Sequence, residues 1–374
     1  MKPIPFNKAS FTKHELKFIS ELKKDGQLSG DGKFAQKCKN FFKNKFGFEN
    51  IFLTTSCTDA LEMIALSLDI NQKTEIIVPT FAFVSCANTF ETHGGKVIFA
   101  DSETDYPNIS YDSIIKNINT NTKALLIIHY GGIPCDIEKI SNLCKKKNII
   151  LIEDCSHAID SKHNNKYLGS YGDLSVFSFH ETKNITCGEG GMLVVNNKKF
   201  IKKITQIYYK GTNRDEFDQK LVSKYQWVSY GASYLLSEIN AAFLYGQLNY
   251  LDAIQKKRMK IFNYYLYRLE KLNVIPEIYY QKSGSAHIFY ILCQSKKQRD
   301  DFIKKMELKK IHTTFHYLPL HKSIFYKRKY KISQNLPNAD NFSKKLVRLP
   351  IFYSLKISEV KKICDEIIEY FSSL

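Results

Sequence analysis

Lys183 follows DLSVFSF, a short apolar run with the composition of a buried strand. An amine directly after such a strand is unusual, because it loses water unless the strand ends at the surface. Loss of water lowers the pKa of the amine, and a neutral amine can attack an aldehyde and later move a proton as a general base. The segment FSFHETKN therefore predicts a reactive lysine.

A carboxylate, Asp154, ends a second apolar run, NIILIED. A buried carboxylate there could cap a helix or pair with a structural cation, and taken alone it favours that use. Next to a reactive lysine, it can instead hold the pyridine nitrogen of pyridoxal phosphate (PLP) protonated, which makes the ring an electron sink. His157 could orient this carboxylate or touch the ring, although a single histidine is more often structural.

Small hydroxyl residues stand immediately before a predicted helix in TTSCTDALEMIAL. The first turn of a helix offers free backbone N–H groups and a favourable dipole, which together bind an anion such as phosphate. Plain capping by Ser56 or Thr58 would leave the same pattern. The segment therefore indicates a phosphate site only in combination with its neighbours.

Further residues are candidates for contact with a cofactor or a substrate. Phe81 and Phe83 come after a strand, where one ring could stack on a cofactor, although core packing is the commoner use. His316 and His321 lie in FHYLPLH, a plausible substrate pocket with no metal-ligand spacing. The glycines of CGEGG would let the backbone turn tightly and pass close to the lysine, or they could form an ordinary turn.

The elements that position these residues alternate along the chain. Six apolar runs read as buried strands: EIIVPT, KVIFAD, KALLIIHY, NIILIED, DLSVFSF and GMLVVN. Helical stretches over 58–70 and 136–147 separate some of them, the second beginning at an Asp suited to capping. We expect an α/β fold with a mostly parallel sheet, whose ligand crevice lies beyond the carboxyl ends of the strands. Four polar residues end or follow such strands: His129, Asp154, Ser178 and Lys183.

The remaining chain predicts a connector and a smaller α/β domain. The pattern over 234–272 is helical without a clear stop, and it is followed by the strand AHIFYILC, a helix over 299–309 and a closing helix over 358–371. We expect residues 1–245 to form the large domain, and residues 246–374 the connector and the small domain.

Composition narrows the function. The net charge of +18 favours anionic partners, but the lysines are scattered and no zinc-finger, RNP-like or basic-helix pattern accompanies them, so nucleic acid is not expected. Nine cysteines without C-x-x-C pairs fit reduced thiols rather than a disulfide or zinc framework. With no signal peptide and no run long enough to span a bilayer, we expect a cytoplasmic protein that does not insert into membranes.

Six segments, taken in order, resemble the DegT/DnrJ/EryC1/StrS family of sugar aminotransferases over nearly the whole chain. They are SFHETKN, GEGG, KGTNR, KYQWVSYGASYLLSEINAA, FHYLPLH and RLPIFYSL. The resemblance implies PLP as cofactor and fold type I of PLP enzymes (aspartate aminotransferase-like), with a mostly parallel sheet in a large domain and a smaller C-terminal α/β domain.

The same resemblance assigns roles around the cofactor ring. Lys183 would carry the cofactor covalently, and Asp154 would pair with its pyridine nitrogen. His157 would lie beside the ring, and Phe83 would occupy the family's stacking position.

At the phosphate, the resemblance implies that Cys57 and Thr58 bind largely through their backbone and Ser178 through its hydroxyl. In most of the family an Asn of the partner subunit also reaches the phosphate, whereas this chain has Ser233 at that point. The departure puts the Asn contact in doubt, but it looks like the mark of a subgroup. We therefore expect a homodimer whose active site is shared between subunits.

The likeness is strongest to members that make dTDP-4-amino-4,6-dideoxy-D-galactose in the enterobacterial common antigen pathway. It implies transfer of an amino group from L-glutamate to C4 of dTDP-4-keto-6-deoxy-D-glucose. Lys210 and Arg214 in the KGTNR region are candidates to meet these anionic substrates, together with His316 and His321.

Three alternatives stay open. A related aminotransferase could give the gluco epimer or act at C3. The dehydratase branch of the fold has histidine in place of the lysine, and Lys183 argues against it. A regulatory or binding protein that keeps the PLP fold without catalysis is the alternative from another class.

Overall fold

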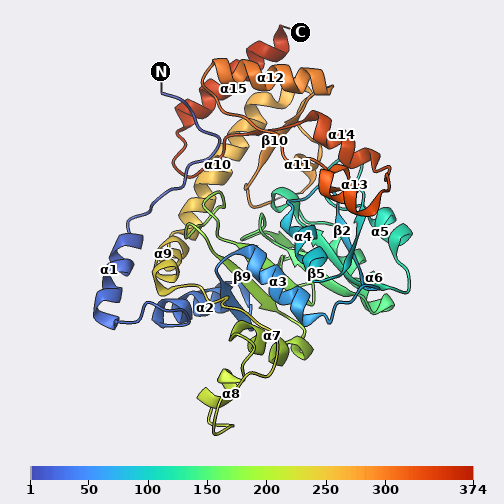
Figure 1. The fold of residues 1–374 in the computed structure, drawn as a ribbon. Helices are drawn as coiled ribbons and strands as arrows, with labels where there is room; N and C mark the ends of the chain where they lie inside the picture. The colour runs from blue at the N-terminus through green and yellow to red at the C-terminus, as the bar shows by residue number, and fades with distance from the viewer. Residues whose placement is uncertain (1, 283, 374) are drawn as a thin grey trace.

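The computed structural model describes residues 2–282 and 284–373 and is built around a seven-stranded sheet (Figure 1). The strand order is β1-β9-β8-β5-β4-β2-β3, and all neighbours run parallel except β9, which is antiparallel to both β1 and β8. The strands are β1 (Ile51–Thr54), β2 (Glu75–Pro79), β3 (Lys96–Ala100), β4 (Thr122–Ile128), β5 (Ile150–Asp154), β8 (Leu174–Ser178) and β9 (Gly191–Val195). This arrangement confirms the predicted α/β class with a mostly parallel sheet.

Helices cover both faces of the sheet because successive residues of each strand point to opposite sides. Along β5, Ile152 packs in the core beneath α3, α4 and α7, whereas Leu151 packs in the core beneath α5 and α6. The helices of the first face are α3 (Cys57–Ser67), α4 (Ser85–Thr92) and α7 (Ile201–Tyr208). Those of the second are α2 (Lys33–Phe46), α5 (Tyr111–Asn117), α6 (Ile137–Lys147) and α9 (Glu238–Leu248).

The C-terminal part forms a further core above this sheet. Its aromatic and aliphatic residues come from α10, β10, α12, β11 and α15, for example Tyr265, Phe289, Phe302, Val347 and Ile363. The elements are α10 (Leu251–Leu269), α11 (Ile278–Gln281), β10 (Phe289–Leu292), α12 (Lys296–Leu308), α13 (Ile324–Tyr330), α14 (Pro337–Lys345), β11 (Leu346–Leu349) and α15 (Ile357–Ser372). Strands β10 and β11 pair antiparallel. Figure 1 shows α10 running from these elements toward the sheet. The exact boundary near residue 245 stays a prediction.

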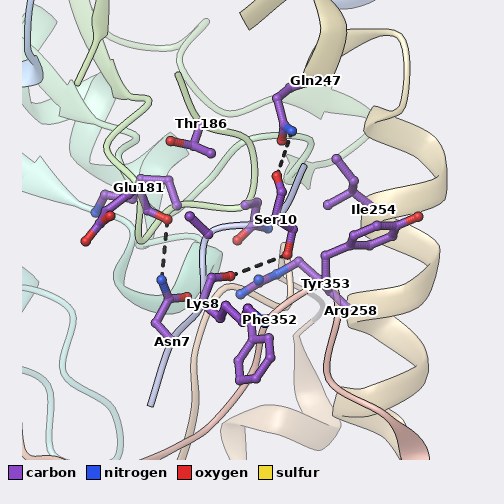
Figure 2. Close-up of a pocket in the computed structure, with 13 residues that line it drawn as sticks. Asn7, Lys8, Ser10, Glu181, Thr186, Gln247, Ile254, Arg258, Phe352 and Tyr353 are labelled. Carbon is purple, nitrogen blue, oxygen red and sulfur yellow. Dashed lines mark hydrogen bonds between the residues drawn. The ribbon is translucent and has the colours of Figure 1, made fainter. Parts of the chain in front are cut away.

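The N-terminal segment ties the two parts together. Ile4 exchanges backbone hydrogen bonds with Lys310 and His312 of the C-terminal part (2.8 and 3.0 Å). Asn7 donates to the carbonyl of Glu181 (3.3 Å), and the Gln247 side chain donates to the carbonyl of Ser10 (3.0 Å), as Figure 2 shows. The chain then forms α1 (Glu15–Asp25).

Residues 209–233, which follow α7, extend from the sheet region as a projection. It contains the short helix α8 (Arg214–Asp218), which Figure 1 shows at the end of the molecule opposite the C-terminus. A small hairpin of β6 (Lys162–His163) and β7 (Lys166–Tyr167) lies between β5 and β8 along the chain. Short 3₁₀ turns occupy Tyr130–Gly132, Lys198–Phe200, Glu270–Leu272 and Leu320–Lys322.

Most predicted elements are confirmed, and two details are wrong. All six apolar runs form strands, and the helices predicted after Thr58, Asp136, Arg299 and Ser358 are present as α3, α6, α12 and α15. The continuous helix predicted over 234–272 is wrong, because the chain breaks at Asn249 and Tyr250, between α9 and α10. Asp136 stands at the N-cap of α6, but its side chain makes no capping hydrogen bond. Among the described residues, no helix is long and apolar enough to cross a membrane.

Candidate active site

The carboxyl ends of the parallel strands bring the chemical residues to one edge of the sheet. Asp154 ends β5 and Ser178 ends β8, and Ser178 lies opposite Gly191, the first residue of the reversed strand β9. Lys183 lies in the loop that joins β8 to β9. Because both ends of this loop are fixed in adjacent strands, the sheet sets the position of the lysine.

Asn184 anchors the lysine loop to the C-terminal part. Its amide nitrogen donates to Gln255 of α10 and to the carbonyl of Ser285, both at 2.8 Å, and its oxygen pairs with His287 Nδ1 at 2.8 Å. At the other end of the loop, the Thr186 hydroxyl donates to the carbonyl of Phe179 (3.0 Å). Asn184 is therefore buried, and both its amide nitrogen and its amide oxygen are hydrogen-bonded.

Burial lowers the pKa of Lys183 to about 8, well below the 10.5 of a lysine in water. The negative charge of Asp154 opposes this shift, and the positive charge of Arg348 adds to it. Near neutral pH a useful fraction of the amine is therefore uncharged, as an attack on an aldehyde requires.

Asp154 is buried, and each of its two oxygens accepts one hydrogen bond from an uncharged donor. Oδ1 accepts from the backbone N–H of Ser156 (2.9 Å), and Oδ2 accepts from the Cys86 thiol (3.2 Å). None of the described cationic side chains forms an ion pair with Asp154. A buried carboxylate without a cation is costly, so a protonated ring nitrogen would supply the partner that the chain leaves out.

His157, three residues after Asp154, is buried and is neutral. Burial, followed by the charges of Lys183 and Arg348, lowers its pKa well below the usual range. Its Nδ1 accepts from the backbone N–H of Gly131 (3.4 Å), and its ring lies 4.6 Å from that of His287. The imidazole can therefore contact a cofactor ring as an uncharged group.

The start of α3 offers free backbone N–H groups that could bind an anion. Ser56 is the N-cap, and its hydroxyl accepts from the backbone N–H of Asp59 (3.0 Å). The N–H groups of Cys57 and Thr58, in the first turn, cannot bond within the helix. Any side chain on Gly191 would lie 2.4–2.5 Å from the backbone of Ser56 and Cys57, so this close approach requires glycine.

Two hydroxyls lie near this helix end or at the same edge. Thr58 Oγ1 is 2.8 Å from Ser85 Oγ. Ser178 is half-buried, and its hydroxyl accepts only a long bond from His180 N–H (3.4 Å). It therefore keeps hydrogen-bonding capacity for a phosphate.

The aromatic candidates differ in exposure. Phe81 is buried against Tyr130 and Tyr317, whereas Phe83 is 58% exposed and lies 6.4 Å from the Tyr317 ring. Large exposed rings next to a site are expected where a flat ligand covers them. Phe83 is therefore the ring free to stack on a cofactor.

The residues predicted to bind substrate do not all lie in one place. Lys210, Arg214 and Ser233 lie at or near the projection, where all three are exposed, and Arg214 lies 3.4 Å from Asp218. His321 is buried, and its Nδ1 lies 2.8 Å from the Thr80 hydroxyl.

His316 is the histidine placed with the cofactor residues. It is half-buried, and its Nδ1 lies 2.7 Å from Nη1 of Arg348. Burial, followed by the charges of Arg348 and Lys183, lowers its pKa to about 4.

Arg348 is the main residue that sequence reasoning missed. It stands on β11 inside RLPIFYSL, a segment used only for its family likeness. The sequence feature that could have revealed this residue is an arginine within an otherwise apolar strand. Phe6, which packs 5.0 Å from its guanidinium, had no signal of its own.

His129, the remaining strand-end residue, is structural. Its Nε2 lies 3.1 Å from Glu153, and its Nδ1 accepts from the N–H of Cys135 (3.1 Å). Together with Cys155, this pair has the spacing of a metal cluster. Glu153 also accepts from the backbone N–H groups of Gly169, Tyr171 and Gly172. With its lone pairs used in this way, the cluster is a buried hydrogen-bond network.

The edge residues fit PLP. An amine of lowered pKa, a buried carboxylate without a cation, an exposed ring and a helix N-terminus correspond to the aldehyde, ring nitrogen, ring face and phosphate of that cofactor.

Known proteins agree with this fit. The model of the DegT/DnrJ/EryC1/StrS aminotransferase family matches residues 10–368. GDP-perosamine synthase of Escherichia coli O157:H7 is 31% identical over 376 residues, covering all of both chains, and that of Vibrio cholerae is 28% identical over 379 residues, covering 99% of this chain and all of the other. Helicobacter pylori PseC, an aminotransferase involved in the biosynthesis of pseudoaminic acid, superimposes with a TM-score of 0.92 at 25% identity, covering all of both chains.

Together with the lysine and carboxylate at the sheet edge, these matches show that the chain belongs to the DegT/DnrJ/EryC1/StrS aminotransferase family and is a PLP-dependent sugar aminotransferase.

Proposed function

We propose that this enzyme transfers the amino group of L-glutamate to C4 of dTDP-4-keto-6-deoxy-D-glucose and forms dTDP-4-amino-4,6-dideoxy-D-galactose. The observation that carries the chemistry is the amine of Lys183, whose pKa burial lowers to about 8, close to a buried carboxylate. The sugar and the epimer are supported by the likeness of SFHETKN, FHYLPLH and RLPIFYSL to the family members that make this product.

PLP supplies an electron sink and carries the amino group between the two substrates. Lys183 holds the cofactor between turnovers and, once released, moves a proton at the reacting carbon as a general base. Asp154 keeps the ring nitrogen protonated, and His157 contacts the ring. The N–H groups of Cys57 and Thr58, with the Ser178 hydroxyl, hold the phosphate.

The active site is completed by a second copy of the chain in this proposal. Trp227 and Tyr230 on the projection are 79% and 78% exposed, which is unusual for such large rings unless a partner covers them. Ser233, Lys210 and Arg214 are exposed at or near the same projection. A homodimer would bring them to the partner's substrate site.

A second candidate substrate is a GDP-linked 4-keto-6-deoxy sugar. It is favoured by two relatives that match at least 99% of the chain and are named GDP-perosamine synthases. The net charge of +18 suits either nucleotide, because both carry the same diphosphate.

One experiment separates these candidates. Purified enzyme with PLP and L-glutamate is given dTDP- and GDP-linked 4-keto and 3-keto sugars, and each product is identified by NMR. We expect the amine at C4 of the dTDP sugar with galacto configuration. A GDP product, a gluco epimer or a C3 amine would replace the proposed substrate, position or stereochemistry.

The control for this panel is Lys183→Ala, which should form no product with any sugar and no cofactor adduct that borohydride traps. Turnover by this variant would refute the mechanism itself, whichever sugar is used.

A further inference from the structure

Helix α13 packs one face on the rest of the molecule and exposes the other. On the inner face, the Tyr326 ring lies 4.7 Å from the ring of Phe99 in β3, and the Tyr330 hydroxyl donates to Glu91 of α4 (2.6 Å). Ser323 caps the helix, because its hydroxyl accepts from the N–H of Tyr326 (3.2 Å). These contacts fix which side chains of α13 point outward.

Two neighbouring large apolar side chains are exposed on the outer side of α13. Ile324 is 78% exposed and Phe325 is 59% exposed, and Ile332, just after the helix, is exposed as well. Single exposed apolar side chains are common, but adjacent ones that remain uncovered indicate a contact surface. Figure 1 shows α13 at an outer edge of the molecule, apart from α8 of the projection. A dimer formed through the projection would therefore not account for this surface.

The same segment is strongly cationic. Residues 311–339 contain no aspartate or glutamate. Their lysine and arginine residues are Lys322, Lys327, Arg328, Lys329 and Lys331. Lys322 pairs with Asp340, and Lys329 pairs with Glu91. The other three cations are exposed and form no ion pair with any residue that the structure describes.

Other lysine-rich helices of the chain are ordinary solvated faces. Lys145 and Lys146 are exposed at the end of α6, but none of the large apolar side chains described in that helix is exposed. On α12 the lysines alternate with acidic residues, as in the pair of Lys296 and Asp300 (3.0 Å). Helix α13 differs from both, because exposed apolar side chains and unpaired cations occur together on it.

This combination fits the surface of a bilayer that contains anionic phospholipid. Cations next to such a surface are attracted to its headgroups, and apolar side chains enter the boundary between the headgroups and the acyl chains. A nucleic acid would also attract the cations, but it offers phosphates and bases that stack on aromatic rings, and an exposed isoleucine matches neither. The apolar part of the surface therefore favours a lipid partner.

We propose that α13 is a docking surface for a membrane face that carries anionic phospholipid. The α13 patch consists of Ile324, Phe325, Lys327, Arg328 and Lys331. Its cations meet the headgroups, and its two apolar side chains enter the boundary with the acyl chains. The protein then lies on the bilayer rather than across it.

Binding to vesicles tests the proposal on the full-length, PLP-loaded enzyme. Sedimentation is measured with vesicles of phosphatidylcholine containing roughly one-third phosphatidylglycerol, and with vesicles of phosphatidylcholine alone. Native enzyme should bind the anionic vesicles at least about tenfold more tightly than the neutral ones, and about 0.5 M salt should remove most of this difference. Failure to bind the anionic vesicles, or equal binding to both kinds, would refute the proposal.

The charge of the α13 patch is tested by the double change Lys327→Glu and Arg328→Glu. Its control, Lys145→Glu with Lys146→Glu, alters the net charge equally at the end of α6. Each cation near an anionic membrane strengthens binding roughly fivefold, so the dissociation constant for anionic vesicles should rise at least about 20-fold in the α13 variant. It should stay within about threefold of native in the control. Equal losses in both variants would mean that the net charge of +18 attracts the vesicles, and the assignment to α13 would be wrong.

The apolar part is tested by Ile324→Ser with Phe325→Ser. Binding to anionic vesicles should weaken at least about tenfold, because contact with the acyl boundary is lost. The control, Ile115→Ser with Leu308→Ser, changes two exposed apolar side chains on α5 and α12 and should bind as the native enzyme does. A loss confined to the charge variant would identify a surface for a soluble polyanion and would exclude the bilayer.

All of these variants change exposed side chains, so circular dichroism and bound PLP should remain native. None of the measurements needs a sugar or an amino donor. Their result is therefore independent of the proposed function.

Discussion

At the residue scale, cofactor attachment should depend on pH. The neutral fraction of Lys183 increases as pH rises through its pKa of about 8, so at pH 6 only about one amine in a hundred is neutral. The rate at which apoenzyme joins PLP covalently should therefore rise roughly 50-fold from pH 6 to pH 8 and level off above. Stopped-flow absorbance measures this rate. Pyridoxamine phosphate, which forms no such bond, should show no matching rise, and equal PLP rates at pH 6 and pH 8 would contradict the assignment.

The positions of Lys183 and Asp154 could be predicted from the sequence because each lies at or just after the end of a recognisable strand, and parallel strands end at one edge of a sheet. Arg348 could not be found in this way, because it belongs to β11 of the C-terminal part, far from Lys183 along the chain. The same holds for Phe6 in the N-terminal segment. The places of both side chains depend on long-range packing, which local sequence pattern does not encode.

Asp154→Asn tests the carboxylate. The variant should retain part of its PLP, because the phosphate and lysine contacts remain, but lose at least about 100-fold in turnover, because the ring nitrogen is no longer held protonated. Bound cofactor is measured by absorbance and turnover with L-glutamate. Glu189→Gln, at an exposed carboxylate of the loop between β8 and β9, is the control. Near-native turnover in Asp154→Asn would show that the ring nitrogen has another partner.

At the element scale, the sequence failed where an element is short or where a boundary lacks a strong breaker. Strand β1 has only four residues, and it was not predicted although it is buried throughout. The break between α9 and α10 falls at Asn249 and Tyr250, neither of which stops a helix by itself. Packing of α9 against α1 and α2 and of α10 against α15 decides the break instead.

The contact between α9 and α2 gives a stability prediction. Glu238, buried at the start of α9, accepts three N–H groups at the start of α2: Gly32 (3.0 Å), Phe34 (2.7 Å) and Ala35 (3.0 Å). Glu238→Gln removes the charge that satisfies this helix end and turns an NH₂ group toward the donors. We expect a loss of about 2 kcal/mol in the free energy of unfolding, measured with urea. Exposed Glu49→Gln should change it by less than about 0.5 kcal/mol.

At the scale of the whole molecule, the composition excluded classes of function more firmly than it chose one. The charge of +18 suits the anionic substrates proposed for the enzyme, and the nine cysteines are free thiols, eight of them buried. They could not indicate the projection, which carries exposed aromatic residues at one end of the molecule (Figure 1). Exposed aromatic residues of this kind are expected where a partner covers them, as in the proposed homodimer.

The dimer is tested on that projection. Native enzyme should have twice the 43.4 kDa mass of one chain by light scattering. The double change Trp227→Lys and Tyr230→Lys places two charges on the exposed rings and should shift the mass toward one chain, with loss of turnover. Leu308→Lys, at an equally exposed position of α12, should remain a dimer. A double variant that stays dimeric and active would place the interface elsewhere.

The loop between β8 and β9 has a practical use. In the proposed attachment at Lys183, the cofactor would be held between β8 and β9, two strands that are hydrogen-bonded to each other, so separation of these strands should change its absorbance. The visible spectrum of the holoenzyme would consequently be an internal reporter of how intact the sheet is, and heat or denaturant damage could be followed in a cuvette without any added dye.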